Sequence, residues 1–116
     1  MMDIDKFKKI NDTFGHHTGD VVLKKSADFL QTVFGDSRFE LFRIGGDEFA
    51  VIARDVSKDV LEEKIKQIRC PKEDLRCSIS CGYAPVDFEK MNAIENAFIE
   101  ADLQMYKNKE AKKNSL

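Results

Sequence analysis

The sequence predicts a single α/β domain, and three observations carry that prediction. The chain has 116 residues, which is the usual length of one globular domain. Segments with apolar residues at helical spacing alternate with short runs rich in β-forming residues. The sequence has no internal repeat, low-complexity tract or Pro/Gly-rich linker, so we expect one compact unit over residues 1–116.

The start of the chain predicts a short strand followed by two helices. Residues 1–4 are too few for a full core strand, so either a longer polypeptide extends it or the fold has a clipped first strand. Phe7, Ile10 and Phe14 recur at helical spacing, and we expect a turn over residues 15–19 to end that helix. A second helix follows and stops near residue 35. Its expected apolar positions are Leu23, Ala27, Leu30 and Phe34.

The middle of the chain predicts a β-hairpin. Residues 39–44 and 49–53 are both rich in β-forming side chains. The connection Gly45-Gly46-Asp47-Glu48 is short enough to join them as antiparallel neighbours.

The last part predicts a helix, a strand and a final helix, so the order of elements is (β)ααββαβα. Ser57 or Asp59 begins the third helix, and residues 76–86 are expected to form a strand. Asn92, with Glu95 three residues later, is typical of a helix start, and the final helix ends in a basic stretch. The expected inner positions are Leu61, Ile65 and Ile68 in the third helix and Ile94, Phe98, Ala101 and Met105 in the last.

Composition narrows the class of protein. A hydrophobic fraction of 42% with 34% charged residues argues against disorder. The net charge of −2 argues against a nucleic-acid partner. No apolar run approaches the roughly 18 residues of a membrane span, and the start lacks the features of a secretory signal. We therefore expect a cytoplasmic domain that makes no membrane contact itself.

The three cysteines, Cys70, Cys77 and Cys81, favour a reducing compartment, because an odd number is a poor disulfide framework. Their spacing is not that of a CxxC zinc pair. Cys77 and Cys81 lie on one face of the expected strand, and we interpret them as small buried apolar side chains.

Three acidic features are candidates for chemistry: Asp3-Ile4-Asp5 at a strand end, Asp47-Glu48 at a hairpin tip, and Asp20 at the expected start of a helix. Carboxylates that converge from neighbouring strands repel each other unless a cation is present, and Mg²⁺ prefers such oxygen ligands. Each feature alone also has an ordinary explanation, as a solvated turn, a capping acid or a charge at a helix N-terminus. The lysines near the end of the chain can likewise be a solvated helix terminus.

The order in which these features occur resembles the GGDEF family of diguanylate cyclases. Residues 45–49 form the name-giving motif Gly-Gly-Asp-Glu-Phe, and residues 3–16 are similar to the family's strand-to-helix segment. Further matching positions are Arg43, Gly19-Asp20 with Leu23 and Ala27, Ser80-Cys81-Gly82-Tyr83, Ala101-Asp102, Tyr106 and Lys109. The resemblance covers nearly the whole chain.

This resemblance implies a fold and a reaction. The fold is an α+β nucleotidyl-cyclase palm (ferredoxin-like), with a mostly antiparallel sheet flanked by helices. The activity is condensation of two GTP into cyclic di-GMP with release of two pyrophosphates. Each domain holds one GTP, so a second domain of the same kind is an implied partner, as is an upstream sensor domain.

The resemblance also implies roles for individual residues. Asp3, the carbonyl of Ile4 and Asp47 would bind Mg²⁺, with Mn²⁺ as an alternative, and Glu48 beside them would assist deprotonation of the attacking hydroxyl. Asn11 and Asp20 would read the guanine edge. The substrate phosphates would meet the backbone amides of Lys6 and Phe7 and the side chains of Lys109 and Lys113.

Several positions depart from the family pattern. The family's inhibitory Arg-x-x-Asp site would fall at residues 36–39, where the sequence is Asp-Ser-Arg-Phe, so we expect no such site. The family's Gly-Arg pair is Lys112-Lys113, which keeps the charge but loses the bidentate fork of arginine. The segment around Cys70 is short, and the helix and most of the strand that usually precede Asp3 are not in the chain.

Two other functions remain open on the sequence alone. A catalytically silent module of the same family would bind GTP or a protein partner for regulation. A polymerase-like palm shares the two-metal logic, but the acidic charge balance and the guanine-reading pair Asn11 and Asp20 argue against it.

Overall fold

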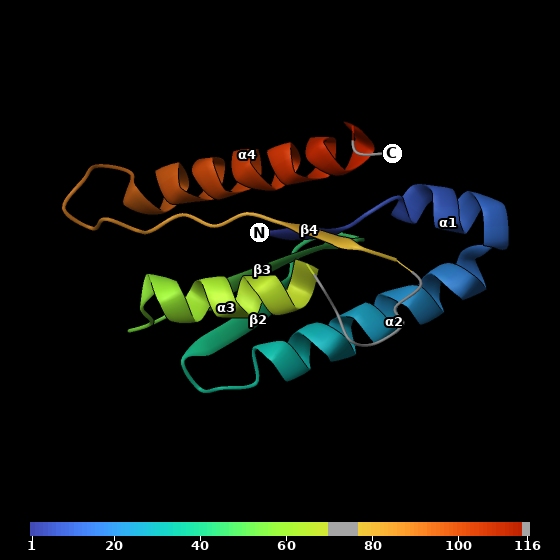
Figure 1. The fold of residues 1–116 in the computed structure, drawn as a ribbon, viewed down its shortest axis with the longest axis horizontal. Coiled ribbons are helices and arrows are strands. Elements are labelled where there is room, and N and C mark those ends of the chain that lie inside the picture. Colours follow the sequence, from blue (N-terminus) through green and yellow to red (C-terminus); the bar gives the residue numbers. More distant parts are fainter. Residues whose placement is uncertain (70–76, 115–116) are drawn as a thin grey trace.

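A four-stranded antiparallel sheet forms the centre of the molecule (Figure 1). The structure is a computed structural model that describes residues 1–69 and 77–114. The strands are β1 (Met2–Ile4), β2 (Phe39–Arg43), β3 (Glu48–Ala53) and β4 (Ile79–Cys81). Their order across the sheet is β2-β3-β1-β4, so the first strand, which has only three residues, lies inside the sheet rather than at its edge.

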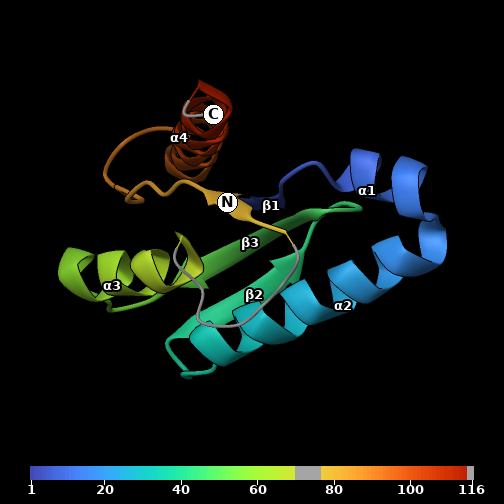
Figure 2. The same ribbon diagram turned by 45° about the vertical axis from the view of Figure 1, so that its right-hand side comes forward.

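Helices cover both faces of this sheet. They are α1 (Phe7–Phe14), α2 (His16–Val33), α3 (Lys58–Arg69) and α4 (Ala93–Asn114). Figures 1 and 2 show α4 alone on one face, whereas α2 and α3 lie together on the other. The arrangement confirms the predicted element order and the antiparallel hairpin of β2 and β3.

Because side chains alternate along β1, one face of the strand is apolar and the other is acidic. Met2 and Ile4 are buried in the apolar core with α2 and α3. Asp3 and Asp5 point to the other face, where they contact α4. A strand of three residues therefore contributes both to the core and to the polar cluster described below.

The apolar core lies between the sheet, α2 and α3. Its buried members are Met2, Ile4, Val22, Phe29, Leu30, Val33, Phe34, Phe39, Phe49, Ile65, Ile68, Ile79 and Cys81. The expected inner residues of α3 are confirmed, because Ile65 and Ile68 are buried and Leu61 is partly buried against the core. Cys81 is buried as expected, whereas Cys77 precedes β4 and is half-buried beside Ser26. Cys70 lies outside the described residues.

The predicted turn over residues 15–19 is wrong, because Gly15 alone separates α1 from α2. Gly15 has a φ of 88°, a conformation that glycine adopts without the penalty of a Cβ atom. Helical hydrogen bonding resumes at once, and the Gly19 amide donates to the Gly15 carbonyl at 3.1 Å. Asp20 consequently lies inside α2 and does not open it.

The strand expected over residues 76–86 is shorter than predicted. β4 ends at Cys81 because its partner β1 begins at Met2, and the next amide, of Gly82, donates to the Met1 carbonyl at 3.0 Å. The following amide, of Tyr83, bonds to the Gln104 side chain on α4 instead of to a strand. Residue 76 lies outside the described part of the chain.

The inner face of the last helix also differs from the prediction. Ala97, Ala101 and Met105 are buried, but Ile94 is 67% exposed and Phe98 is 49% exposed. The buried residues are those near the end of β4, since Gly82 lies against the backbone of Ala101 and Met105. Figure 1 shows that the N-terminal part of α4 extends beyond the short β4.

Candidate functional site

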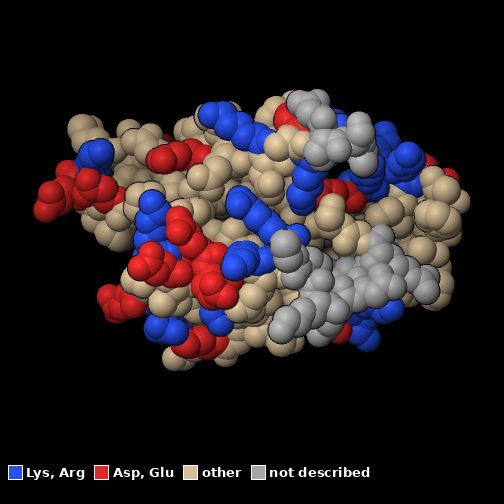
Figure 3. Space-filling model, viewed as in Figure 1, with Lys and Arg blue, Asp and Glu red and all other residues tan. Residues whose placement is uncertain are grey.

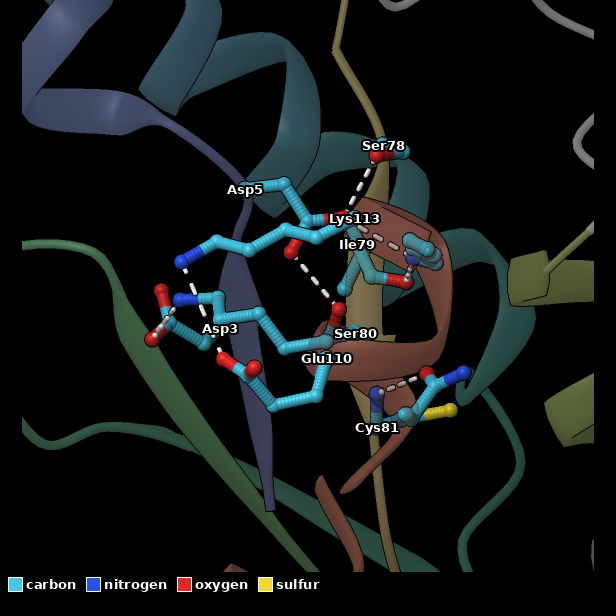
Figure 4. A network of polar contacts seen from close by, with 11 residues as sticks. Asp3, Asp5, Ser78, Ile79, Ser80, Cys81, Glu110 and Lys113 are labelled. Atoms are coloured by element: carbon cyan, nitrogen blue, oxygen red, sulfur yellow. Dashed lines mark hydrogen bonds and ion pairs between the residues drawn. The ribbon is translucent and has the colours of Figure 1, made fainter. Parts of the chain in front are cut away.

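Two ion pairs join β1 to the C-terminal part of α4. The Lys109 ammonium donates to Asp3 Oδ2 at 2.8 Å, and the Lys112 ammonium donates to Asp5 Oδ2 at 2.8 Å. Asp3 and Asp5 are two apart on a strand, and the two lysines are three apart on a helix, so each pair shares one face. Figure 4 shows the carboxylates of Asp3, in β1, and of Asp5, just after it, on the side where α4 lies.

Asp3 is a buried carboxylate with an incomplete set of partners. It is 8% exposed, and within the described residues its Oδ1 atom has no hydrogen-bond partner. Burial, together with the neighbouring Asp47 carboxylate, raises the pKa of Asp3 to about 6, although Lys109 acts in the opposite direction. The site therefore holds excess negative charge that a cation would stabilise.

Asp47 reaches Asp3 because the turn between β2 and β3 is fastened to β1. The Ile4 amide donates to the Asp47 carbonyl at 3.1 Å. The Arg43 guanidinium donates to the carbonyls of Gly45 at 3.1 Å and Gly46 at 2.9 Å, which holds the turn from the other side. This bracing brings the second candidate carboxylate beside the first.

Glu48 lies on the same face of the sheet as Asp3, because the two residues are direct partners across β3 and β1. Its carboxylate lies over Gly45, where an added Cβ atom would be 3.4 Å from Glu48 Oε2. The structure thus brings Asp3, Asp47 and Glu48 to one end of the sheet, as the sequence predicts.

Both carboxylate oxygens of Asp5 accept hydrogen bonds. The hydroxyls of Ser78 and Ser80 donate to its two oxygens, the latter at 2.6 Å, and Lys112 adds the third donor. Burial raises the pKa of Asp5, but the hydrogen bonds from Lys112 and both serines outweigh it and bring the pKa below its ordinary value. Lys112 also donates to the Ile79 carbonyl at 2.8 Å, so this network ties α4 to β4.

A basic hollow of about 460 Å³ adjoins this network. Its lining residues are Asp5, Lys6, Ser78, Lys109, Lys112 and Lys113. Lys6 stands at the N-terminus of α1 in a left-handed conformation, with a φ of 57°. Figure 3 shows basic side chains gathered at the end of the molecule where α1 and the C-terminal part of α4 lie. The hollow is suited to an anion.

Asn11 and Asp20 lie at the junction of α1 and α2. The Asn11 side chain rests directly against Gly19, where a Cβ atom would collide with the amide oxygen. Asp20 is the next residue of α2 and is exposed. The packing of the two helices therefore brings the two predicted base-reading residues to one junction. Among the described residues, the hydrogen bonds and ion pairs of Asp3 and Asp5 include none with these two.

The sequence suggested Asp5 only as a strand-end or capping acid and Lys112 only as a charge at a solvated helix end, and the hydrogen bond from Ser80 to Asp5 was not predicted. The signal was available in the spacing: acids at strand positions 3 and 5 and lysines at helix positions 109 and 112 each define one face. Only the packing of α4 on β1 shows that the two faces meet.

The donor set fits a divalent cation that takes further ligands from a substrate. Within residues 1–69 and 77–114, no three His, Cys, Asp or Glu side chains form a metal site by themselves. Asp3 and Asp47 supply two carboxylates, and the Asp3 Oδ1 atom is buried without a donor. Oxygen ligands of this kind, completed by water or phosphate oxygens, are typical of Mg²⁺ sites.

The chain is similar to known proteins over almost its whole length. Residues 1–115 match the family described as diguanylate cyclase, GGDEF domain. The chain is 36% identical over 110 residues to the probable diguanylate cyclase DgcI of Escherichia coli, covering 94% of the chain and 24% of that protein.

A second relative is an uncharacterized membrane protein of Staphylococcus haemolyticus, 30% identical over 126 residues. That match covers the whole chain and 35% of the relative, so the chain spans about a third of that protein's length. Among the helices in the described part of the chain, none has the length and apolar character that a membrane crossing requires.

A solved structure carries the same fold. The GGDEF domain of DgcB from Caulobacter crescentus, crystallised in complex with c-di-GMP, superposes with a TM-score of 0.69 at 30% identity. The match covers 95% of this chain and 70% of that one, which confirms the predicted palm-like fold. By sequence and by fold, this chain belongs to the GGDEF domain family of diguanylate cyclases.

Proposed function

We propose that the domain is a diguanylate cyclase, which condenses two GTP molecules into cyclic di-GMP and releases two pyrophosphates. The observation that carries the proposal is the meeting of Asp3 and Asp47 beside the lysine-lined hollow. Metal-assisted phosphoryl transfer needs this combination of carboxylates and phosphate-binding cations.

The hollow supports binding of the triphosphate. Lys6, Lys109 and Lys113 line it, and each ammonium can donate to phosphate oxygens. The amides of Lys6 and Phe7 stand at the N-terminus of α1, where the first-turn amides have no acceptor within the helix. Together these groups would hold the β- and γ-phosphates away from the reacting atoms.

Asp3, Asp47 and the carbonyl of Ile4 would hold the divalent cation, Mg²⁺ or Mn²⁺. When bound, the metal would polarise the α-phosphate and neutralise the departing pyrophosphate. The protein's own part is to keep two carboxylates together at one sheet end, through the bonds of Ile4 and Arg43 to the turn. Glu48, on the same face, would accept the proton of the attacking hydroxyl.

Asn11 and Asp20 would bind the base. Guanine presents N1–H and N2–H₂ donors that a carboxylate accepts, and acceptors that an amide can reach. The exposure of Asp20 at the junction of α1 and α2 supports this assignment, because a base can approach it from solvent.

A single domain binds one GTP in this scheme, so the reaction needs two domains face to face. The 3′-hydroxyl of each GTP attacks the α-phosphate of the other, one P–O bond forms, and pyrophosphate leaves with the electron pair of the broken P–O bond. A catalytically silent module that binds GTP without making product is the alternative.

The test is a product assay with GTP and Mg²⁺ on the parent chain and on Asp47→Ala, scored for cyclic di-GMP. We expect product from the parent and at least about a thousandfold less from the variant, because a catalytic metal site loses one of its ligands. Asp28→Ala is the matched control, since Asp28 is an exposed acid on α2, and it should keep the parent rate.

Equal product from Asp47→Ala and the parent would overturn the mechanism. GTP binding by the parent without product would instead favour the silent module.

A further inference from the structure

Lys109 and Asp3 form an ion pair, although the proposed function assigns them to different ligands. Asp3 is assigned to the metal and Lys109 to the phosphates. In the structure the Lys109 ammonium lies 2.8 Å from Asp3 Oδ2 and so occupies one side of the carboxylate. The other oxygen, Oδ1, is buried, and the described residues offer it no donor.

The charges around this contact do not balance. Asp3 and Asp47 bring two negative charges together, and Lys109 brings one positive charge. A divalent cation would balance both carboxylates, which a single ammonium cannot do. The buried pair would then no longer need Lys109 as its counter-charge.

We propose that Lys109 occupies part of the cation site when metal is absent, and that the metal displaces it from Asp3 and thereby makes it available to the substrate phosphates. The role of the released Lys109 rests on the proposed function, but its displacement by the metal is a binding event that can be tested without turnover. Metal and nucleotide would bind cooperatively, because the same event fills the carboxylates and frees a phosphate ligand.

The rest of α4 can stay in place during this exchange. Cys81 donates its amide to Asn108 at 3.1 Å, and Tyr83 donates its amide to Gln104 at 2.7 Å. Lys112 remains tied to Asp5 and to the Ile79 carbonyl. These links fix the helix on β4 independently of Lys109, so only one side chain has to move.

The test measures Mn²⁺ binding to the full chain without nucleotide, by the electron paramagnetic resonance signal of free Mn²⁺, at constant pH and ionic strength. Lys109→Met keeps an unbranched side chain, one atom shorter, and removes its charge. If Lys109 competes with the metal, we expect this variant to bind Mn²⁺ about five- to tenfold more tightly than the parent.

Lys113→Met is the matched control, because Lys113 is on the same helix, lines the same hollow and pairs with Glu110 rather than Asp3. It measures the general effect of removing one positive charge nearby, which we expect to be less than about twofold in salt. Lys109→Arg keeps the charge and should bind Mn²⁺ no more tightly than the parent.

Weaker or unchanged Mn²⁺ binding by Lys109→Met would overturn the inference, because it would mean that Lys109 organises Asp3 for the metal. An effect equal to that of Lys113→Met, or no Mn²⁺ binding by any of the proteins, would also overturn it. Cyclic di-GMP formation is scored separately. If the parent makes product but Lys109→Met does not bind Mn²⁺ more tightly, the displacement of Lys109 is wrong and the proposed function is retained. If Lys109→Met binds Mn²⁺ more tightly but the parent makes no product, the displacement is retained and the proposed function is wrong.

Discussion

Gly19 determines where the Asn11 side chain can lie at the proposed base site. The three atoms nearest to an added methyl group there all belong to the side chain of Asn11, which can change its rotamer. The position is helical, so the glycine is not required by the backbone. Its absent side chain instead leaves the space in which the Asn11 amide lies.

We predict that Gly19→Ala binds GTP about tenfold more weakly without losing folding stability. Alanine favours a helix over glycine by up to about 1 kcal/mol, which offsets the displacement of a flexible side chain. GTP affinity by calorimetry and the free energy of unfolding by urea would be measured side by side.

Asn11→Ala provides the comparison for that prediction. If Gly19 acts through Asn11, the double variant should be no weaker than either single one, because both changes remove the same interaction. Unchanged GTP affinity in Gly19→Ala would show that the position of Asn11 is not needed.

At the scale of elements, the seat of α4 on β4 depends on a second glycine with a different kind of neighbour. A Cβ atom on Gly82 would collide with the backbone of α4, at the Ala101 carbonyl and the Met105 amide. Because helix backbone cannot move aside as a side chain can, the helix would have to lift from the strand.

We predict that Gly82→Ala lowers the free energy of unfolding by about 1–3 kcal/mol, the usual cost of overpacking. Gly46→Ala is the matched control, since a Cβ atom there meets nothing within 4 Å, and it should change stability by less than about 0.5 kcal/mol. Urea unfolding of both variants checks the prediction. Equal stabilities would mean that α4 is not held as closely as the structure indicates.

Helix α4 also supplies the lysines that pair with Asp3 and Asp5. Lys109 and Lys112 reach Asp3 and Asp5 only while α4 lies flat on the sheet. A displaced helix would also move the lysines of the hollow, so Gly82→Ala should impair phosphate binding as well as folding.

At the scale of the whole molecule, the proposed chemistry requires a pair of domains. In the proposed scheme the lysine-lined hollow of one chain holds the phosphates of one GTP, whereas the product contains two guanine nucleotides. We predict that the rate per chain rises with protein concentration and that, well below the dimer dissociation constant, the total rate rises with its square.

Product formation measured over a hundredfold range of concentration checks this. An excess of Asp47→Ala added to the parent should suppress product, because mixed pairs contain one defective half. A rate per chain that is independent of concentration, with no suppression, would contradict a dimer of weakly associating domains.

Much of the fold follows from local sequence signals. The spacing of Ile65 and Ile68 predicts the buried face of α3, and the two β-rich runs around Gly45 predict the hairpin. The elements that the sequence predicts poorly are those whose limits depend on neighbours. β4 ends where its pairing with β1 ends, and Ile94, at the N-terminal end of α4, is exposed.

The sequence by itself determined the family, the element order and the identity of the candidate acids and lysines, because these depend on residue type and spacing along the chain. Only the tertiary structure decided which of them meet. Asp3 and Lys109 are 106 positions apart. No local pattern records that Asp3 in β1 and Asp5 just after it meet Lys109 and Lys112 on one face of α4. That pairing arises because Met2 and Ile4 bury their side chains on the opposite face of the strand and so turn Asp3 and Asp5 toward the helix.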